Sequence, residues 1–303
     1  LNSGLAYGKL GRMYYQALGV EQDYNKAAEL LTKGCDLDDD FSCTVLGMLY
    51  SEGNGVALDY AKAIELFRKG CNLNSGLAYG KLGRMYYQAL GVEQDYNKAA
   101  ELFTKGCDLD DAFSCTFLGM MYENGVSVAL DYAKAIELYR KGCTLNSGHA
   151  CGGLGRMYAN GKGVALDYAK AAELLTKGCD LDNAFSCSIL GKMYENGEGV
   201  EQDAAQANKY FTKSCYLGSG NACALLAINY LNGAGGDQSL KKATELYKRA
   251  CDLDSSVGCY NLGVAYVNGD GVRANDKLGT EYFKKACDLG DQDGCATYAE
   301  LNR

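Results

Sequence analysis

The stretch LNSGLAYGKLGRMYYQALGVEQDYNKAAEL, residues 1–30, recurs without a single change at residues 73–102. The cysteines show that this shift is twice a shorter period. One series is spaced by 36 residues and consists of Cys35, Cys71, Cys107, Cys143, Cys179, Cys215, Cys251 and Cys287. A second series keeps the same spacing but skips position 79, and consists of Cys43, Cys115, Cys151, Cys187, Cys223, Cys259 and Cys295. A strict internal period of this length predicts an array of like structural units.

Each unit carries the pattern of two amphipathic helices, which we call the A helix and the B helix. In FSCTVLGMLYSEG, residues 41–53, the side chains of Cys43, Leu46 and Tyr50 lie at helical spacing and define one face of an A helix. A glycine turn follows, and Asp59 then occupies the N-cap position of a B helix. The equivalent position holds other good N-cap residues in the remaining units: Asp23, Asp95, Asp131, Asp167, Asp203, Ser239 and Asn275.

No single pair of helices can bury its apolar face alone, so stacked neighbours must supply the core. Glycine recurs in the middle of the A helices, where it costs about 1 kcal/mol relative to alanine, and this indicates close helix packing. These glycines are Gly47, Gly83, Gly119, Gly155, Gly191 and Gly263. We therefore predict an all-α fold, a right-handed α/α solenoid of stacked 36-residue hairpins. We expect a single repeat array over residues 1–303, with units at about 1–37, 38–73, 74–109, 110–145, 146–181, 182–217, 218–253 and 254–289 and a terminal half repeat at 290–303.

Composition excludes two classes of partner. The formal net charge of −8 argues against nonspecific nucleic-acid binding, which needs clustered Lys and Arg. No apolar run approaches the roughly 18 residues of a membrane span. We expect no nucleic acid, no membrane insertion, no cofactor and a monomeric chain. No signal peptide is visible, and because Leu1 opens inside a motif that recurs at Leu73 and Leu145, we expect the natural start to lie upstream.

The paired cysteines allow three interpretations: a disulfide, a metal site or a catalytic thiol. In a continuous helix Cys35 and Cys43 would lie about 12 Å apart, whereas a disulfide needs Cα atoms roughly 4.4–6.8 Å apart. The chain must therefore reverse at DLDDD, residues 36–40, where aspartates favour a turn and an N-cap. A zinc site or a thiol nucleophile would need ligands or a base that one histidine, His149, cannot supply to seven pairs.

Disulfides are therefore the favoured interpretation, and they imply an oxidising compartment, such as the bacterial periplasm or the extracellular space. The predicted bonds are Cys35–Cys43, Cys107–Cys115, Cys143–Cys151, Cys179–Cys187, Cys215–Cys223, Cys251–Cys259 and Cys287–Cys295. Cys71 is the odd cysteine, because Tyr79 occupies its partner's position. We predict a free, partly buried thiol at Cys71; the alternative is a dimer linked through it. No metal site is predicted.

The unit also resembles a known family. The motif L-G-x-x-Y, G-x-G-V, D-x-x-K-A-x-E-L and K-G-C resembles Sel-like repeats, relatives of the tetratricopeptide repeat. In the second unit it is carried by Leu46, Gly47, Tyr50, Gly55, Val56, Asp59, Lys62, Ala63, Glu65, Leu66, Lys69, Gly70 and Cys71. With its cysteine pairs, the chain is similar to the Helicobacter cysteine-rich protein family. It departs from the pattern at Tyr7, Tyr79, Ser127 and Gly236.

The resemblance implies stacked α/α hairpins with one disulfide per repeat, and secretion or periplasmic residence. It also implies partner binding in host–bacterium interaction and, for some members, penicillin binding with weak β-lactamase activity. The sequence contains little that supports the enzyme alternative. Of the serine β-lactamase motifs only S-x-x-K occurs, at Ser239–Lys242, and S-D-N and K-T-G are absent. We assign no catalytic residue.

Positions that vary between units point to a binding surface. Three such columns lie three residues apart along the A helices and form one face, which in a solenoid lined by A helices is the concave face. We call the candidate residues on it the A-helix stripe: Lys9, Arg12, Tyr15, Lys81, Arg84, Tyr87, Arg156 and Lys192. Cations there suit carboxylates or backbone carbonyls of an extended peptide; the plainer alternative is a solvated surface.

We therefore predict a disulfide-stapled scaffold that binds protein or peptide partners through its concave face, in bacterial secretion or host interaction. The alternatives are a penicillin-binding protein with weak β-lactamase activity, which rests on the family resemblance, and an engineered or duplicated array without a selected ligand.

Overall fold

The computed structural model describes residues 3–301, and this part of the chain contains helices and no strands. Odd-numbered helices are A helices and even-numbered helices are B helices. In chain order they are α1 (Gly4–Gln16), α2 (Tyr24–Asp36), α3 (Asp40–Glu52), α4 (Tyr60–Asn72), α5 (Gly76–Gln88), α6 (Tyr96–Asp108), α7 (Ala112–Asn124), α8 (Tyr132–Thr144), α9 (Gly148–Asn160), α10 (Tyr168–Asp180), α11 (Ala184–Asn196), α12 (Ala204–Tyr216), α13 (Gly220–Asn232), α14 (Leu240–Asp252), α15 (Ser256–Asn268), α16 (Asp276–Asp288) and α17 (Gln292–Leu301). The predicted all-α architecture of repeated 36-residue hairpins is confirmed.

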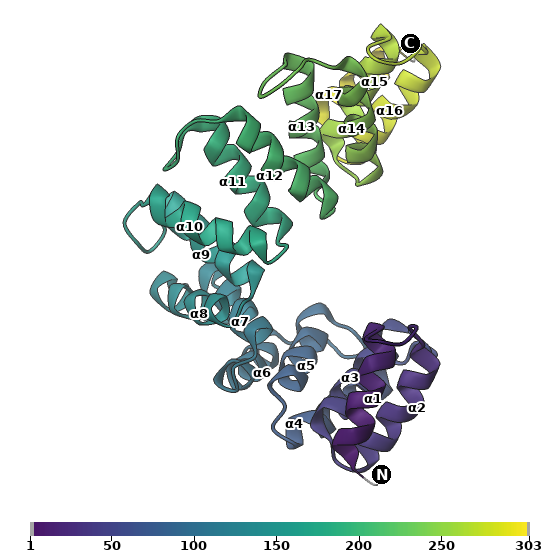
Figure 1. The fold of residues 1–303 in the computed structure, drawn as a ribbon, viewed down its shortest axis with the longest axis vertical. Helices are drawn as coiled ribbons and strands as arrows, with labels where there is room; N and C mark the ends of the chain where they lie inside the picture. The colour runs from purple at the N-terminus through teal and green to yellow at the C-terminus, as the bar shows by residue number, and fades with distance from the viewer. Residues whose placement is uncertain (1–2, 302–303) are drawn as a thin grey trace. The chain divides into compact units, whose positions relative to one another are not determined.

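The chain forms two compact units, Leu1–Ala150 and Cys151–Arg303. Consecutive helices pack against each other from α1 to α8 in the first unit and from α10 to α17 in the second (Figure 1). Among helices two apart in the chain, the A helices make the closer contacts: α1 with α3, α3 with α5 and α5 with α7 in the first unit, and α13 with α15 in the second. The A helices thus form the tighter layer. A single array over the whole chain stays a prediction.

Capping side chains set the helix starts, as predicted. Asp59 has an extended backbone and accepts a hydrogen bond from the Lys62 backbone N–H at 2.9 Å. The same bond type begins the other B helices, at Asp23, Asp95, Asp131, Asp167, Asp203, Ser239 and Asn275. At the other end, the A helix α3 stops at Gly53, whose φ of 71° ends the helix in the left-handed region.

The reversal between a B helix and the next A helix lies at the predicted aspartates. Asp38 adopts a left-handed backbone with φ 56°. Asp39 caps α3 and accepts a hydrogen bond from the Ser42 N–H at 2.9 Å. The reversal brings Cys35 and Cys43 together, with Cα atoms 4.6 Å apart. Disulfides with Cα separations of 4.4–4.7 Å join Cys107–Cys115, Cys179–Cys187, Cys215–Cys223, Cys251–Cys259 and Cys287–Cys295, and both Cys143 and Cys151 are disulfide-bonded.

Mid-helix glycines let the two helices of a hairpin approach closely. A Cβ atom on Gly47 would lie 2.7 Å from the Phe67 ring on α4, so only glycine leaves room for that buried ring. The other members of this column face a buried side chain in the same way, at Gly83, Gly119, Gly155, Gly191 and Gly263. The second unit has one exception, Ala227, whose facing residue is Tyr247. The Tyr247 hydroxyl is buried without a hydrogen-bond partner, and burial raises its pKa to about 12.

Successive B helices are joined through a lysine. The Lys69 ammonium donates to the Cys35 carbonyl at 2.6 Å and lies 3.0 Å from the Asp38 carboxylate. It therefore meets the carbonyl end of α2, where a cation is favourable. The pattern recurs at Lys141 with Cys107 and Asp110, and at Lys285 with Cys251 and Asp254. Lys213 pairs with Asp182 at 3.0 Å. These pairs are partly exposed, so each contributes about 0–1 kcal/mol.

In the turn between an A helix and a B helix, we predict that alanine substitution at two glycines lowers the stability by different amounts. Gly53 and Gly55 both have positive φ, but a Cβ on Gly55 would lie 2.4 Å from the Tyr24 backbone, whereas the nearest atom to one on Gly53 lies 3.5 Å away. We expect Gly53→Ala to cost about 1 kcal/mol through backbone strain alone. Gly55→Ala must also displace α2 and should cost about 1–3 kcal/mol more. Urea denaturation of both variants tests this, and equal costs would contradict it.

The missing disulfide can be supplied. Tyr79 packs against the buried cluster that contains Cys71. The two residues are eight positions apart, which is the separation of the cysteines in each disulfide. We expect Tyr79→Cys to form an additional bond, which closes a nine-residue loop worth about 2.5 kcal/mol. Tyr79→Ser loses the same ring without forming a bond and is the control. Thermal unfolding with and without reductant, and mass after alkylation, should show a bridge and a higher Tm for Tyr79→Cys only.

Candidate protein-binding surface

In the first unit the A-helix stripe consists of two identical sets of three residues, which we call its two copies: Lys9, Arg12 and Tyr15 on α1, and Lys81, Arg84 and Tyr87 on α5. On α1, Lys9 and Arg12 are exposed. On α5, the equivalent Lys81 and Arg84 are half-buried. The copies lie on the A helices, which make the tighter layer of the unit.

Each copy places a cation over a phenylalanine of the next A helix. The Arg12 guanidinium carbon lies 5.8 Å from the centre of the Phe41 ring on α3. The Lys81 ammonium lies 5.2 Å from the centre of the Phe113 ring on α7. Such stacking holds the cation at a fixed place on the surface. At the first copy a hollow of about 160 Å³ is lined by Leu5, Gly8, Lys9, Arg12, Asp39 and Phe41.

An aspartate lies beside each copy, Asp39 at the first and Asp111 at the second, and each caps the start of the next A helix. Asp111 accepts a hydrogen bond from the Ser114 N–H at 2.8 Å at the start of α7. Burial raises the pKa of Asp111, against the lowering effect of Ser114 and Lys81. The pKa of Lys81 is lowered, because burial removes water from its ammonium and Arg84 repels it. The second copy is therefore a partly desolvated cationic patch, where added carboxylates would be held more strongly than in open water.

The tyrosines of the stripe point toward the B helices. The Tyr15 ring centre is 5.9 Å from that of Tyr24 on α2, and the Tyr87 ring centre is 5.1 Å from that of Tyr96 on α6. Burial, followed by the nearby Glu52 charge, raises the pKa of Tyr15. Both rings are half-buried and pack against the B helix of their own hairpin, so only part of each is available on the surface.

In the second unit, α9 carries Arg156, which is half-buried, and α11 carries Lys192, which is exposed. Phe185, at the start of α11, occupies the position that Phe41 and Phe113 hold in the first unit and is 49% exposed. The structure thus brings three stripe residues together on α1 and three on α5, and places the other two in the second unit. The phenylalanines were not part of the predicted set, although their recurrence every 72 residues was a usable signal.

Cys71 is the free cysteine and is buried at the end of α4, with 7% of its surface exposed. Burial raises the pKa of its thiol to about 12. So deeply placed a thiol is poorly accessible for a bond to a second chain. Ser239 is the N-cap of α14 and accepts from the Lys242 backbone N–H, while the Lys242 ammonium lies 5.1 Å from the Tyr230 ring centre. Residues 3–301 contain no group of three His, Cys, Asp or Glu side chains able to hold a metal ion.

Eight consecutive matches to the Sel1 repeat model cover residues 4–39, 41–75, 76–111, 112–147, 148–183, 184–219, 220–255 and 256–291. The chain belongs to the Sel1 repeat family. Sel1 repeats form helical scaffolds that typically mediate protein–protein interactions. The resemblance to Sel-like repeats stated from the motifs is therefore confirmed. In the part of the chain that the structure covers, no helix is long and apolar enough to cross a membrane.

Two solved structures of this fold resemble the chain over most of its length, and a third resembles less than half of it. A Sel1 repeat protein from Oxalobacter formigenes is 22% identical, with a TM-score of 0.70, over 98% of this chain and 86% of the other. A protective antigen of uropathogenic Escherichia coli with an SLR fold is 25% identical, with a TM-score of 0.61, over 98% of this chain and 72% of the other. Helicobacter pylori cysteine-rich protein B is 35% identical over 44% of this chain and 95% of its own, with a TM-score of 0.37. No curated protein matches the chain.

The environment of Cys71 predicts its reactivity. Because the raised pKa keeps the thiol protonated, we expect iodoacetamide at pH 8 to label the native protein far more slowly than the urea-unfolded protein. Folding favours the neutral thiol, so this group's contribution to stability is complete below about pH 9 and is lost as the pH rises toward about 12. Equal labelling rates in the native and unfolded protein would contradict the burial, and Cys71→Ala gives the unlabelled background.

Proposed function

We propose that the Sel1 array binds an extended acidic segment of a partner protein along the A-helix stripe. The observation that supports this most directly is the repeated cation over phenylalanine, Arg12 over Phe41 and Lys81 over Phe113. The ring fixes each cation, so less side-chain freedom is lost when a carboxylate binds. Arginine also suits planar, bidentate recognition of carboxylates.

The 72-residue spacing of the two copies supports an extended ligand. The copies lie on α1 and α5 of one compact unit, with the A helix α3 between them. A segment that contacts both at once gains the advantage of linked sites, because the second contact is intramolecular. The proposed partner therefore carries at least two acidic clusters separated by a spacer.

We propose that the protein works in the periplasm or outside the cell, in bacterial secretion or host interaction. Structural disulfides persist in oxidising compartments, and this chain has roughly one per repeat. The similar antigen of uropathogenic Escherichia coli supports a surface or host-facing role.

The proposal is tested with peptides selected from a phage-displayed library on the immobilised protein. We expect acidic sequences to be enriched and to bind less tightly as salt rises. The triple variant Arg12→Gln, Arg84→Gln, Arg156→Gln should lower their affinity at least about tenfold, since each lost charge-assisted hydrogen bond contributes about 1.5–3 kcal/mol. Fluorescence anisotropy measures the affinities.

The matched control removes three cations from B helices: Lys98→Gln, Lys134→Gln and Lys170→Gln. These lysines pair with Glu101, Glu137 and Glu173 on their own helices. The control changes the net charge by the same amount and should leave the affinity within about twofold. Selection of peptides without acidic residues, or equal losses in the two triple variants, would reject the stripe as the binding surface.

The β-lactamase alternative gains no support from Ser239. Its hydroxyl accepts from the Lys242 backbone, as the other N-caps of the B helices do, and the Lys242 side chain lies toward Tyr230. A Ser–Lys nucleophile would need the lysine amine at the serine oxygen.

A further inference from the structure

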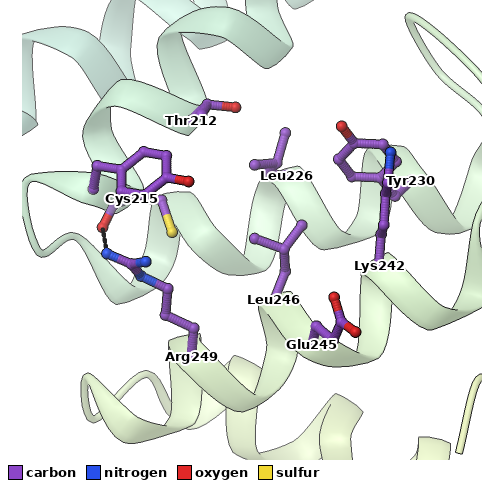
Figure 2. Close-up of a pocket in the computed structure, with 9 residues that line it drawn as sticks. Thr212, Cys215, Leu226, Tyr230, Lys242, Glu245, Leu246 and Arg249 are labelled. Atoms are coloured by element: carbon purple, nitrogen blue, oxygen red, sulfur yellow. Dashed lines mark hydrogen bonds between the residues drawn. The ribbon is translucent and has the colours of Figure 1, made fainter.

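The second unit has a pocket between two successive B helices. It lies between α12 and α14 and over α13, with a volume of about 360 Å³ (Figure 2). Ligand pockets start at about this size. The lining residues are Thr212, Cys215, Tyr216, Leu226, Tyr230, Lys242, Glu245, Leu246 and Arg249.

Two departures from the repeat make this pocket. Position 216 holds an aspartate in five other repeats, at Asp36, Asp108, Asp180, Asp252 and Asp288, but here it is a tyrosine that is 72% exposed. Position 218 holds Asp38, Asp110, Asp182 and Asp254 in four of these five repeats, but here it is glycine. The corner before α13 has therefore lost two carboxylates and gained an aromatic wall.

The loss of Asp at position 218 leaves Arg249 without an ion pair. Its counterparts Lys69, Lys141, Lys213 and Lys285 lie 2.9–3.7 Å from an aspartate carboxylate. The Arg249 guanidinium instead donates to the Cys215 carbonyl at 3.5 Å (Figure 2). It also lies 4.8 Å from the Tyr216 ring centre. Among residues 3–301 no carboxylate oxygen lies within 4.0 Å of it. Most of its donors remain available at the mouth of the pocket.

The other two charged groups of the pocket are also unpaired. Their counterparts form ion pairs within one helix at Lys62–Glu65, Lys98–Glu101, Lys134–Glu137 and Lys170–Glu173. Here no such pair joins Lys242 and Glu245 in the described chain: the Lys242 ammonium lies over Tyr230 instead. Glu245 lies between the two cations along α14, and Leu226 and Leu246 form the floor (Figure 2).

We infer that this pocket binds a carboxylate with an attached apolar group, as at the C-terminal residue of a peptide with an apolar last side chain. Arg249 takes the carboxylate, because its free donors lie at one end of the pocket. The apolar side chain lies on Leu226 and Leu246 beside Tyr216. Glu245 accepts the N–H of the bound residue. A volume of about 360 Å³ suits one or two residues, so the pocket recognises a chain end and not a long segment.

A fluorescein-labelled pentapeptide ending in leucine with a free carboxylate is the probe, and its C-terminal amide is the control ligand. Fluorescence anisotropy should show saturable binding of the acid and at least about tenfold weaker binding of the amide, because one charge-assisted contact is lost. Competition by N-acetylleucine shows whether the carboxylated residue alone is enough or whether the peptide chain before it also contributes.

The most discriminating variants change Gly218, which does not line the pocket itself. A Cβ there meets no atom within 4 Å, and the repeat equivalents with aspartate or asparagine also have a positive φ, of 56–62°, against 94° at Gly218. Gly218→Asp restores the missing ion pair to Arg249, so it should weaken peptide binding at least about tenfold. Gly218→Asn adds a side chain of the same shape without the charge, and it should leave binding unchanged. Asparagine occupies this position naturally in two other repeats, at Asn74 and Asn146.

Arg249→Gln should weaken binding as much as Gly218→Asp does, whereas Lys285→Gln, its counterpart in the next repeat, should leave binding unchanged. Circular dichroism checks that the variants remain folded. No saturable binding at millimolar peptide, equal binding of acid and amide, or equal effects of Gly218→Asp and Gly218→Asn would each overturn the inference. The stripe variants Arg12→Gln and Arg84→Gln should not change this binding, so the two surfaces are tested separately.

Discussion

The corner between one hairpin and the next is the constraint on which the rest of the structure depends. Helices α1–α16 are each 13 residues long, close to the limit below which an isolated helix is marginal in water. Their stability must come from neighbours, and the corner decides where the neighbour lies. A left-handed residue such as Asp38 reverses the chain, Asp39 begins the next helix, and the bond between Cys35 and Cys43 fixes the reversal. Closing a nine-residue loop contributes about 2.5 kcal/mol at each such corner.

Close packing on the A side and wider spacing on the B side give the array two different surfaces. A helices two apart contact each other, and there the cations lie over phenylalanine rings of the neighbouring helix. B helices are bridged by long lysines that reach the previous corner. At Gly218 that bridge lacks its aspartate, and a pocket lined by Tyr216 and Arg249 lies between α12 and α14. The same repeat thus supplies the proposed surface for an extended ligand on A helices and the proposed small site between B helices.

Most of the fold could be predicted from the sequence, because its determinants are local and periodic. The N-cap at Asp59, the reversal at Asp38–Asp39 and the cysteine spacing each depend on residues within one corner or one turn. The surfaces were harder, because they depend on contacts between repeats. Tyr15 and Tyr87 belong to the variable columns, yet they pack on Tyr24 and Tyr96. The pocket depends on the residues that replace the aspartates, Tyr216 and Gly218, and periodicity alone does not interpret such replacements.

The odd cysteine also has a chemical consequence. Disulfides rearrange when a thiolate attacks a bonded sulfur, so one reactive thiol among fourteen bonded cysteines could exchange partners along the array. The Cys71 thiol, with a pKa of about 12, is almost entirely protonated at neutral pH and is buried among side chains of α4 and α5. It is therefore a poor nucleophile toward the bonds at Cys35–Cys43 and Cys107–Cys115. Burial of Cys71 thus keeps the one free thiol unreactive toward the neighbouring disulfides, so the pairing formed during oxidative folding is preserved.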